Sequence, residues 1–282
     1  MNRFLAIVIL LFSVFQILSL HAFTAKAENS TGKEVHQPLD YSWTNDVPPY
    51  IAHACSGITG MTYTNSREAF LRNYASGHRV FEIDFNLTLD GALIAAHDID
   101  HWKHITGTEL PFTSKNFDQL LIYGRYESLT WPEIIDLMVE YPDTYIVTDT
   151  KGYTQDRVIQ TFSQLVSCAK QTHPEVLDRI IPQIYNENML SWITSIHPFK
   201  SVIFTLYAIQ WSPQSVLDFC ISSGVRFITM PVHTVSEDII RLWDTIGIQV
   251  AVHTVNDAQQ IDDLFRMGVD MIYTDFVSPN ES

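Results

Sequence analysis

The sequence has few cysteines and few cationic residues, and both shortages exclude classes of protein. Its 282 residues include only 3 cysteines, Cys55, Cys168 and Cys220, with no C-x-x-C pair or zinc-ligand spacing. A disulfide framework and a structural zinc site are therefore not expected, and each cysteine is predicted to be a small buried residue. Lysine and arginine number 17 against 32 aspartates and glutamates, giving a formal net charge of -15. Because such a surface repels phosphate backbones, we expect no nucleic-acid partner.

The first residues have the pattern of an export signal. Arg3 precedes an almost wholly apolar run at residues 4–20, and Ala25-Lys-Ala27 has small residues where a signal peptidase reads the chain. We expect residues 1–27 to be a cleaved signal peptide, which predicts a secreted, periplasmic or cell-envelope protein. An uncleaved membrane anchor is the alternative, since about 18 apolar residues can begin to span a bilayer. The polar residues 28–49 are predicted to be a linker or N-terminal arm.

From residue 50 onward, short apolar strands alternate with helical patterns. An apolar fraction of 46% in a chain of this length suits one large globular domain. Strands are expected at residues 50–54, 79–85, 145–149, 179–184, 201–206, 226–230, 249–253 and 270–274. Eight strands with helices between them predict an α/β fold, a closed (β/α)₈ TIM barrel spanning residues 50–278. An open doubly wound sheet is disfavoured because no G-x-G-x-x-G follows the first strand.

The segment between strand 2 and helix 2 is long. Residues 93–96 extend the second strand after a turn at Asp90-Gly91, and residues 98–128 lose clear periodicity. We interpret this segment as an inserted excursion over the site, because long irregular loops in compact domains are usually functional. A variable surface loop is the alternative. Before strand 2, Asn65-Ser-Arg-Glu68 fits a capping box at the start of a helix.

Charged and titratable side chains recur at the predicted carboxyl ends of the first three strands. In a barrel these ends share one rim, where the active site lies. A single Glu-x-Asp pair would be explained by a solvent-facing strand edge, but the coincidence on one rim favours catalysis. The residues are His53, Glu82, Asp84, His97, Asp149 and Lys151. Gln183, Tyr185 and His253 lie on the same predicted rim and are candidate substrate contacts.

This residue set suits the cleavage of a small-molecule phosphodiester. The carboxylates Glu82, Asp84 and Asp149 can hold one Ca²⁺ or Mg²⁺ ion, because hard cations prefer oxygen ligands. Lys151 can neutralise a phosphoryl oxygen. Two histidines can divide the proton transfers between the attacking hydroxyl and the leaving alkoxide.

Two stretches resemble the signatures of glycerophosphodiester phosphodiesterases, within the phosphatidylinositol-specific phospholipase C-like superfamily. The amino-terminal stretch includes Tyr50-Ile-Ala-His53, Phe81-Glu-Ile-Asp84 and Ala96-His-Asp98. The carboxyl-terminal stretch includes Gly268-Val-Asp-Met-Ile-Tyr-Thr-Asp275. The resemblance implies a (β/α)₈ enzyme that uses Ca²⁺ or Mg²⁺ to cleave glycerophosphodiesters into glycerol 3-phosphate and an alcohol. It also implies a cyclic phosphate formed by attack of the glycerol 2-hydroxyl.

By matching positions, the resemblance implies that His53 and His97 are the acid/base pair. Glu82 and Asp84 would be metal ligands, and Lys151 a phosphate contact. The chain departs from the family pattern at three places. Ala54-Cys55 stands where Arg-Gly is usual, Thr64 stands where glutamate is usual, and Asp149 replaces a glutamate.

Two other functions fit the same residues. One is a phospholipase C- or D-like enzyme that acts on intact phospholipids at a lipid surface, which the export signal and the aromatic residues near Trp102 favour. The other is a catalytically degenerate module that binds phosphate. The absence of the arginine that is usual at position 54 favours this alternative. Retention of both histidines and all three acids favours an enzyme.

Overall fold

The structure is a computed structural model that describes Pro38–Asn280. The expected signal peptide at residues 1–27, and the first part of the expected arm at residues 28–37, lie outside the described residues. Among the helices in the described range, none has the length and hydropathy needed to cross a membrane.

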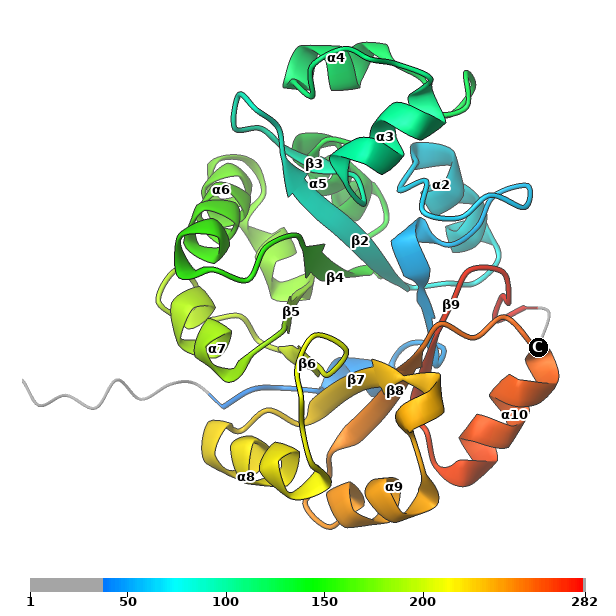
Figure 1. The fold of residues 1–282 in the computed structure, drawn as a ribbon, viewed down its shortest axis with the longest axis vertical. Helices are drawn as coiled ribbons and strands as arrows, with labels where there is room; N and C mark the ends of the chain where they lie inside the picture. Colours follow the sequence, from blue (N-terminus) through cyan, green and yellow to red (C-terminus); the bar gives the residue numbers. More distant parts are fainter. Residues whose placement is uncertain (1–37, 281–282) are drawn as a thin grey trace, which may run out of the picture. The chain divides into compact units, whose positions relative to one another are not determined.

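Eight parallel strands form a closed barrel (Figure 1). They are β1 (Tyr50–Ala52), β2 (Val80–Leu87), β4 (Tyr145–Thr150), β5 (Ile180–Ile184), β6 (Ile203–Thr205), β7 (Phe227–Pro231), β8 (Gln249–His253) and β9 (Met271–Thr274). The first strand pairs with both β2 and β9, and this pairing closes the ring. The predicted (β/α)₈ barrel is confirmed, and the open sheet is excluded.

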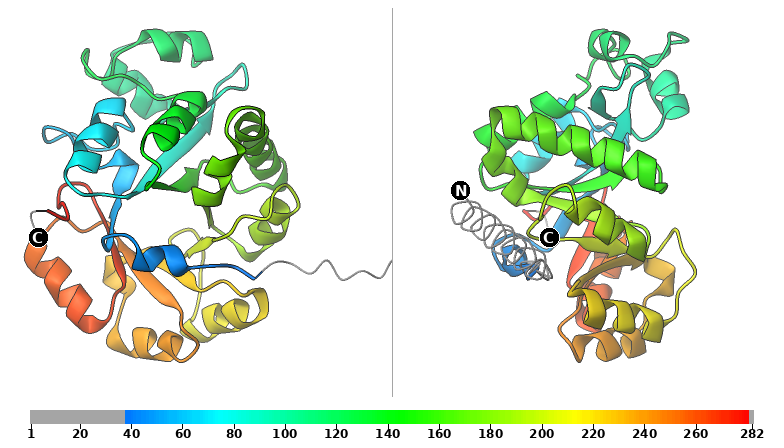
Figure 2. Two further views of the ribbon diagram at one scale, coloured as in Figure 1. Left: turned by 180° about the vertical axis from the view of Figure 1, so that it is seen from behind. Right: turned by 90° about the vertical axis from the view of Figure 1, so that its left-hand side faces the viewer.

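Helices connect successive strands and surround the barrel, as the views in Figure 2 show. They are α2 (Arg67–Ala75), α5 (Trp131–Glu140), α6 (Gln155–Thr172), α7 (Glu187–Thr194), α8 (Pro213–Ser223), α9 (Glu237–Asp244) and α10 (Ala258–Met267). Their starts follow from local chemistry: Asn186, Ser236 and Asp257 each accept a hydrogen bond from the backbone of the following first turn. Short 3₁₀ segments are η1 (Ser42–Asn45), η2 (His53–Cys55), η3 (Pro174–Arg179) and η4 (Val232–Thr234).

The start of α2 differs from the predicted capping box. Ser66 is the N-cap, and its hydroxyl accepts a hydrogen bond from the Ala69 backbone N–H at 3.3 Å. Asn65 has a left-handed φ of 48° and bonds instead to Asp84. Glu68 accepts from the Glu127 backbone N–H at 2.9 Å rather than from the cap. The Asn-x-x-Glu pattern was therefore wrong by one residue, because a distant aspartate binds the asparagine side chain.

The predicted insertion between strand 2 and helix 2 is present but is not irregular. It contains β3 (Leu93–Ala95), antiparallel to β2, followed by α3 (Ile99–Thr106) and α4 (Ser114–Gln119). Figure 1 shows both helices beside the β2–β3 hairpin, outside the ring of barrel helices. Trp102, Phe112 and Phe117 are buried in a small separate core with Ile94 and Ala96. This local core explains how a segment without strong periodicity folds.

The interior of the barrel is filled by one apolar layer. Each strand contributes at least one residue to it, namely Ile51, Val80, Val147, Ile181, Ile203, Phe227, Ala251 and Met271. The segment at residues 38–49 closes the amino-terminal end of this layer. Trp43 of η1 is 6% exposed, packs against Phe227 with ring centroids 5.7 Å apart, and donates from Nε1 to Ser201 Oγ at 3.0 Å. The described part of the arm therefore belongs to the folded barrel.

Replacement of Trp43 by alanine should lower the free energy of unfolding by about 3–5 kcal/mol, because it leaves a cavity under the barrel layer. Urea denaturation followed by circular dichroism measures this change. Trp43→Phe keeps an aromatic ring at this position but loses the bond to Ser201, and it should lower the free energy of unfolding clearly less. Equal stability of Trp43→Ala and the wild-type chain would contradict a closing role for the arm.

Candidate active site

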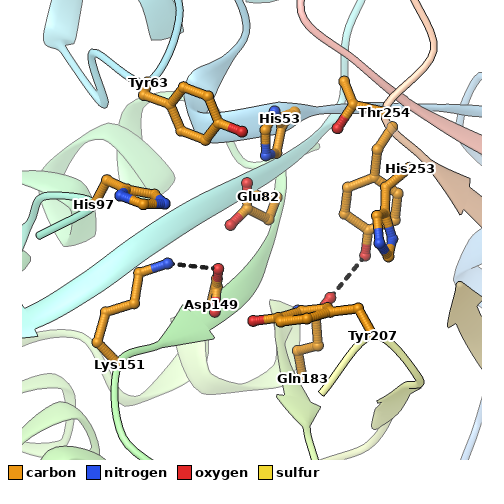
Figure 3. Close-up of a pocket in the computed structure, with 11 residues that line it drawn as sticks. His53, Tyr63, Glu82, His97, Asp149, Lys151, Gln183, Tyr207, His253 and Thr254 are labelled. Carbon is orange, nitrogen blue, oxygen red and sulfur yellow. Dashed lines mark hydrogen bonds and ion pairs between the residues drawn. The ribbon is translucent and has the colours of Figure 1, made fainter. Parts of the chain in front are cut away.

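A cavity of about 360 Å³ opens at the carboxyl ends of the barrel strands (Figure 3). Its lining residues come from seven of the eight barrel strands or from the loops that follow them. They are His53, Tyr63, Glu82, His97, Asp149, Lys151, Gln183, Tyr207, His253, Thr254 and Tyr273. Seven residues proposed from the sequence thus line one cavity. Residues 98–128, all within the described range, contribute nothing to this lining, so the excursion lies beside the site rather than over it.

Three carboxylates from two adjacent strands converge at the cavity, where Glu82 and Asp149 line it and Asp84 lies behind the lining. Oxygens of Glu82, Asp84 and Asp149 lie within 4.8 Å of one another, and the β2–β4 register pairs Asp84 with Asp149. The Lys151 ammonium lies 2.7 Å from a carboxylate oxygen of each aspartate. Glu82 accepts a hydrogen bond from the Ala54 backbone N–H at 2.7 Å. Asp149, which was predicted at the end of the third strand, therefore lies beside Glu82 and Asp84 of the second strand.

Burial and mutual repulsion dominate the electrostatics of this cluster. Burial, with the Asp84 charge adding to it, raises the pKa of Glu82 to about 8. Burial also raises the pKa of Asp149. For Asp84, the burial effect is outweighed by the Lys151 ammonium, which lowers the pKa of that carboxyl. One ammonium cannot balance three acids, and an oxygen-only cluster short of positive charge fits a hard divalent cation such as Ca²⁺ or Mg²⁺.

Both histidines carry a carboxylate on Nδ1. His53 Nδ1 lies 2.8 Å from Asp275 Oδ1, and His97 Nδ1 lies 2.7 Å from Asp98 Oδ2. A partner on Nδ1 fixes the ring orientation and leaves Nε2 for proton transfer. Burial opposes protonation of His53, but the hydrogen bond to Asp275 and the Glu82 charge outweigh it and raise the pKa of His53 to about 9.

Several residues support or border the site without having been predicted, and they include Asp275, Asn256, Asn65 and Tyr63. Asp275 orients His53, and Asn256 holds that aspartate by a side-chain bond of 2.9 Å and a backbone bond of 2.7 Å. Asn65 brackets Asp84 by donating to its carboxylate at 2.9 Å and accepting from its backbone N–H at 3.1 Å. Tyr63 lies between the two histidines. The resemblance to the carboxyl-terminal signature could have singled out Asp275, but no local sequence pattern marks Asn65 or Tyr63 as a site residue.

The departures from the family pattern have clear structural positions. Ala54 is fully buried and does not line the cavity, so its side chain contributes nothing to phosphate binding. Cys55 is buried with a left-handed φ of 66°, a backbone conformation that favours glycine. Thr64 is buried and its hydroxyl bonds to Ser66 at 3.0 Å. The departures at Ala54 and Thr64 thus leave the described lining of the cavity without a guanidinium and without a carboxylate beyond Glu82 and Asp149.

The cavity has a charged half and an uncharged half. In Figure 3 the histidine pair, Tyr63, the two labelled acids and Lys151 lie on one side, with Gln183, Tyr207, His253 and Thr254 opposite. Tyr273 donates to Gln183 Oε1 at 3.0 Å, and burial lowers the pKa of His253 to about 4, which keeps that imidazole neutral. Tyr185, a candidate substrate contact, is buried outside the lining, where its hydroxyl bonds to Asp149. It therefore positions a carboxylate.

Comparison with solved structures finds the same fold in several phosphodiesterases. A phosphodiesterase from Oleispira antarctica, in complex with the product sn-glycerol 3-phosphate, matches with a TM-score of 0.68 and 19% identity over 83% of this chain and 95% of that one. A glycerophosphodiester phosphodiesterase from Parabacteroides distasonis matches with a TM-score of 0.65 and 19% identity over 80% and 92%. One from Thermotoga maritima matches with a TM-score of 0.61 and 17% identity over 80% and 94%.

The comparison with curated proteins finds no sequence match. The family model of the glycerophosphoryl diester phosphodiesterase family matches residues 57–278. This match covers most of the barrel, and it agrees with the fold and with the residues gathered in the cavity. The chain therefore belongs to the glycerophosphoryl diester phosphodiesterase family and is a glycerophosphodiester phosphodiesterase-like hydrolase.

Proposed function

We propose that the protein is a metal-dependent phosphodiesterase that cleaves glycerophosphodiesters to sn-glycerol 3-phosphate and an alcohol. The observation that carries this proposal is the convergence of two carboxylate-paired histidines and a buried cluster of three acids in one cavity. The product bound to the Oleispira antarctica phosphodiesterase supports the choice of substrate.

The acids and Lys151 form the phosphate-binding side of the proposed site. A Ca²⁺ or Mg²⁺ ion held by Glu82, Asp84 and Asp149 would polarise a phosphoryl oxygen. Lys151, fixed by two aspartates at 2.7 Å, presents its ammonium to the same group. Tyr185 and Asn65 hold two of the carboxylates and leave them little freedom to reorient. A preorganised cluster of this kind stabilises developing charge without reorganisation during the reaction.

The histidines perform the proton transfers in this proposal. One Nε2 atom accepts the proton of the glycerol 2-hydroxyl while that oxygen attacks phosphorus, and the other Nε2 atom donates a proton to the departing alkoxide. Attack from within the substrate needs only alignment, because the nucleophile is already attached. It releases the alcohol and leaves a cyclic phosphate, whose ring a water molecule then opens to give sn-glycerol 3-phosphate while the two imidazoles exchange their acid and base roles. Asp275 and Asp98 keep both rings in the tautomer that such a transfer requires. The uncharged half, with Gln183 and His253, then contacts the organic part of the substrate.

Glycerophosphocholine should be converted to sn-glycerol 3-phosphate by the purified chain, and the 2-deoxyglycerol analogue of the substrate should not be cleaved. Phosphorus NMR follows substrate, cyclic phosphate and product in one time course. Chelator should stop turnover, and added Ca²⁺ or Mg²⁺ should restore it. Cleavage of the 2-deoxy analogue would exclude internal attack, and full activity in chelator would exclude the metal. Metal and phosphate binding with no turnover would instead indicate a binding module.

A second candidate is an enzyme that acts on intact phospholipids, and one observation favours it. Among the described residues, exposed large apolar side chains concentrate at positions 89–123, on and around the excursion. They are Leu89, Ile99, Leu110, Leu121 and Tyr123. An apolar surface beside the cavity would suit a bilayer. Faster turnover of phosphatidylcholine vesicles than of glycerophosphocholine would select this candidate.

We also propose that the protein is exported, with residues 1–27 removed as a signal peptide and a mature chain that begins in the arm. The apolar run behind Arg3 and the small residues at Ala25 and Ala27 support this proposal. Amino-terminal sequencing of the protein recovered outside the cytoplasm should begin at Glu28. Recovery of the intact amino terminus in the membrane fraction would contradict cleavage.

A further inference from the structure

The charged half of the cavity has few groups that can donate to a phosphodiester. Lys151 is the single lysine or arginine among the described lining residues, and its ammonium is shared between two aspartates. Ala54, at the position where the family usually has arginine, is fully buried. A phosphodiester has two non-bridging oxygens that need donors or cations, and charge-assisted hydrogen bonds are the strong ones. A further donor is therefore expected from another residue.

Tyr63 is in the right place to be that donor. Its ring packs edge-on between the two imidazoles, with centroids 4.8 Å from His53 and 4.9 Å from His97. Figure 3 shows the hydroxyl on the His53 side, above Glu82 and facing the cavity. No hydrogen bond joins this hydroxyl to any residue in the part of the chain that the structure describes. The phenol thus lies beside both proton-transfer groups with its polar atom unused.

The backbone holds Tyr63 in an unusual conformation. Its φ is 56°, in the left-handed region that aromatic residues rarely adopt. The surrounding loop is anchored on both sides of it: Thr59 Oγ1 bonds to the Tyr126 hydroxyl at 2.7 Å, and the Asn65 N–H donates to the Ala54 carbonyl at 3.2 Å. Strained backbone of this kind persists where the surrounding structure fixes it, and it concentrates at functional sites.

The phenol is a donor rather than an anion at neutral pH. Burial is the main cause that raises the pKa of Tyr63, and the charges of Asp275, Asp84 and Glu82 raise it further. Lys151 acts in the opposite direction but does not reverse the shift. A protonated hydroxyl that makes no hydrogen bond to the described residues is free to donate to a phosphoryl oxygen that enters the cavity.

We propose that the Tyr63 hydroxyl donates a hydrogen bond to a non-bridging oxygen of the substrate phosphodiester, in the role that a guanidinium from position 54 would otherwise fill. This inference rests on the proposed function and adds a substrate-contacting residue to it. The ring itself spaces the two imidazoles. Removal of the hydroxyl alone therefore separates contact with phosphate from support of the histidines.

Tyr63→Phe is the test, because it retains the ring and removes only the oxygen. It should lower kcat/KM for glycerophosphocholine about 10²-fold, the usual effect of losing one donor to developing charge. It should also weaken sn-glycerol 3-phosphate binding about 10-fold in calorimetry with Ca²⁺ present. The pH dependence of kcat/KM should keep its shape, because the ring still separates the histidines.

Tyr74→Phe is the matched control. It removes the exposed bond from the Tyr74 hydroxyl on α2 to Asp143, which takes no part in holding the Tyr63 loop, and Tyr74 does not line the cavity. We expect kcat/KM to stay within about threefold of the wild-type value. An equal loss in both variants, or a shifted pH profile with unchanged product binding in Tyr63→Phe, would overturn the proposal by assigning Tyr63 a purely supporting role.

Failure of the proposed function would look different. In that case the wild-type chain would cleave no diester, and the binding measurement alone would decide the role of Tyr63. Weaker sn-glycerol 3-phosphate binding by Tyr63→Phe than by the wild-type chain would support the proposal without turnover. Unchanged binding would reject it.

Discussion

Replacement of His53 by alanine should lower kcat/KM for glycerophosphocholine about 10³-fold or more. The half-buried imidazole lies beside the acid cluster and is oriented by Asp275 at 2.8 Å, and a water molecule in its place would lack both this orientation and the basicity of an imidazole. Loss of a positioned general acid or base typically costs 10²- to 10⁴-fold. The kcat/KM of His97→Ala should be lower than the wild-type value by a similar factor. Steady-state kinetics at saturating Ca²⁺ measures both.

His101→Ala is the control for this pair. Its ring lies 5.9 Å from His97 and 6.1 Å from Tyr63, yet it does not line the cavity. We expect less than about threefold loss. A p-nitrophenyl diester of glycerol phosphate then identifies the general acid, because p-nitrophenolate is a good leaving group that departs without a proton. The variant whose kcat/KM recovers on this substrate is the one that lacks the general acid. Wild-type rates in both His53→Ala and His97→Ala would exclude histidine catalysis.

Glu82→Gln should abolish metal binding and turnover while it stabilises the metal-free protein. The pKa of this buried carboxyl rises from 4.5 to about 8, so its ionisation opposes folding. Between pH 4.5 and about 8 the folded chain keeps this carboxyl protonated while the unfolded chain ionises it, so the penalty on folding begins near pH 4.5 and grows until the pH reaches about 8. Because glutamine takes up no proton, the substitution should add roughly 2–4 kcal/mol to the free energy of unfolding in chelator at neutral pH.

Urea denaturation at pH 7.5 and at pH 4.5 checks the sign of this effect. The gain from Glu82→Gln should be present at the higher pH and nearly absent at the lower one, where this carboxyl is protonated in the folded chain and about half protonated in the unfolded chain. Glu187→Gln, an exposed glutamate on α7, should change neither stability nor Ca²⁺ binding. Unaltered Ca²⁺ affinity of Glu82→Gln in calorimetry would remove this residue from the metal site.

The barrel could be predicted from the sequence because its strands are short apolar runs spaced by amphipathic helices. Once the strands are placed, their carboxyl ends meet on one rim, and Glu82 and Asp149 are brought together without knowledge of any loop. The structure of the excursion at residues 98–128 was harder to predict. Its two helices are stabilised by a local core around Trp102, and three scattered aromatic residues do not produce a periodic signal.

The supporting residues of the site could not be predicted for a related reason. Asn65 resembles a helix cap in the sequence, and only the folded chain brings Asp84 within reach of its amide. Tyr63 is placed by a left-handed backbone at a residue type that rarely adopts it. Tyr185 follows a strand at the rim, but its side chain is buried outside the cavity lining and its hydroxyl donates to Asp149. Long-range contacts determine all three positions.

The bond between His53 and Asp275 spans 222 positions of the chain. Its two residues follow the first and the last strands of the ring, which lie side by side only after the circle of strands is complete. A chain that lacks β9 and the residues after it has no Asp275, so its His53 imidazole has no carboxylate to orient it. The tautomer of this histidine is therefore set jointly by the two ends of the ring of strands.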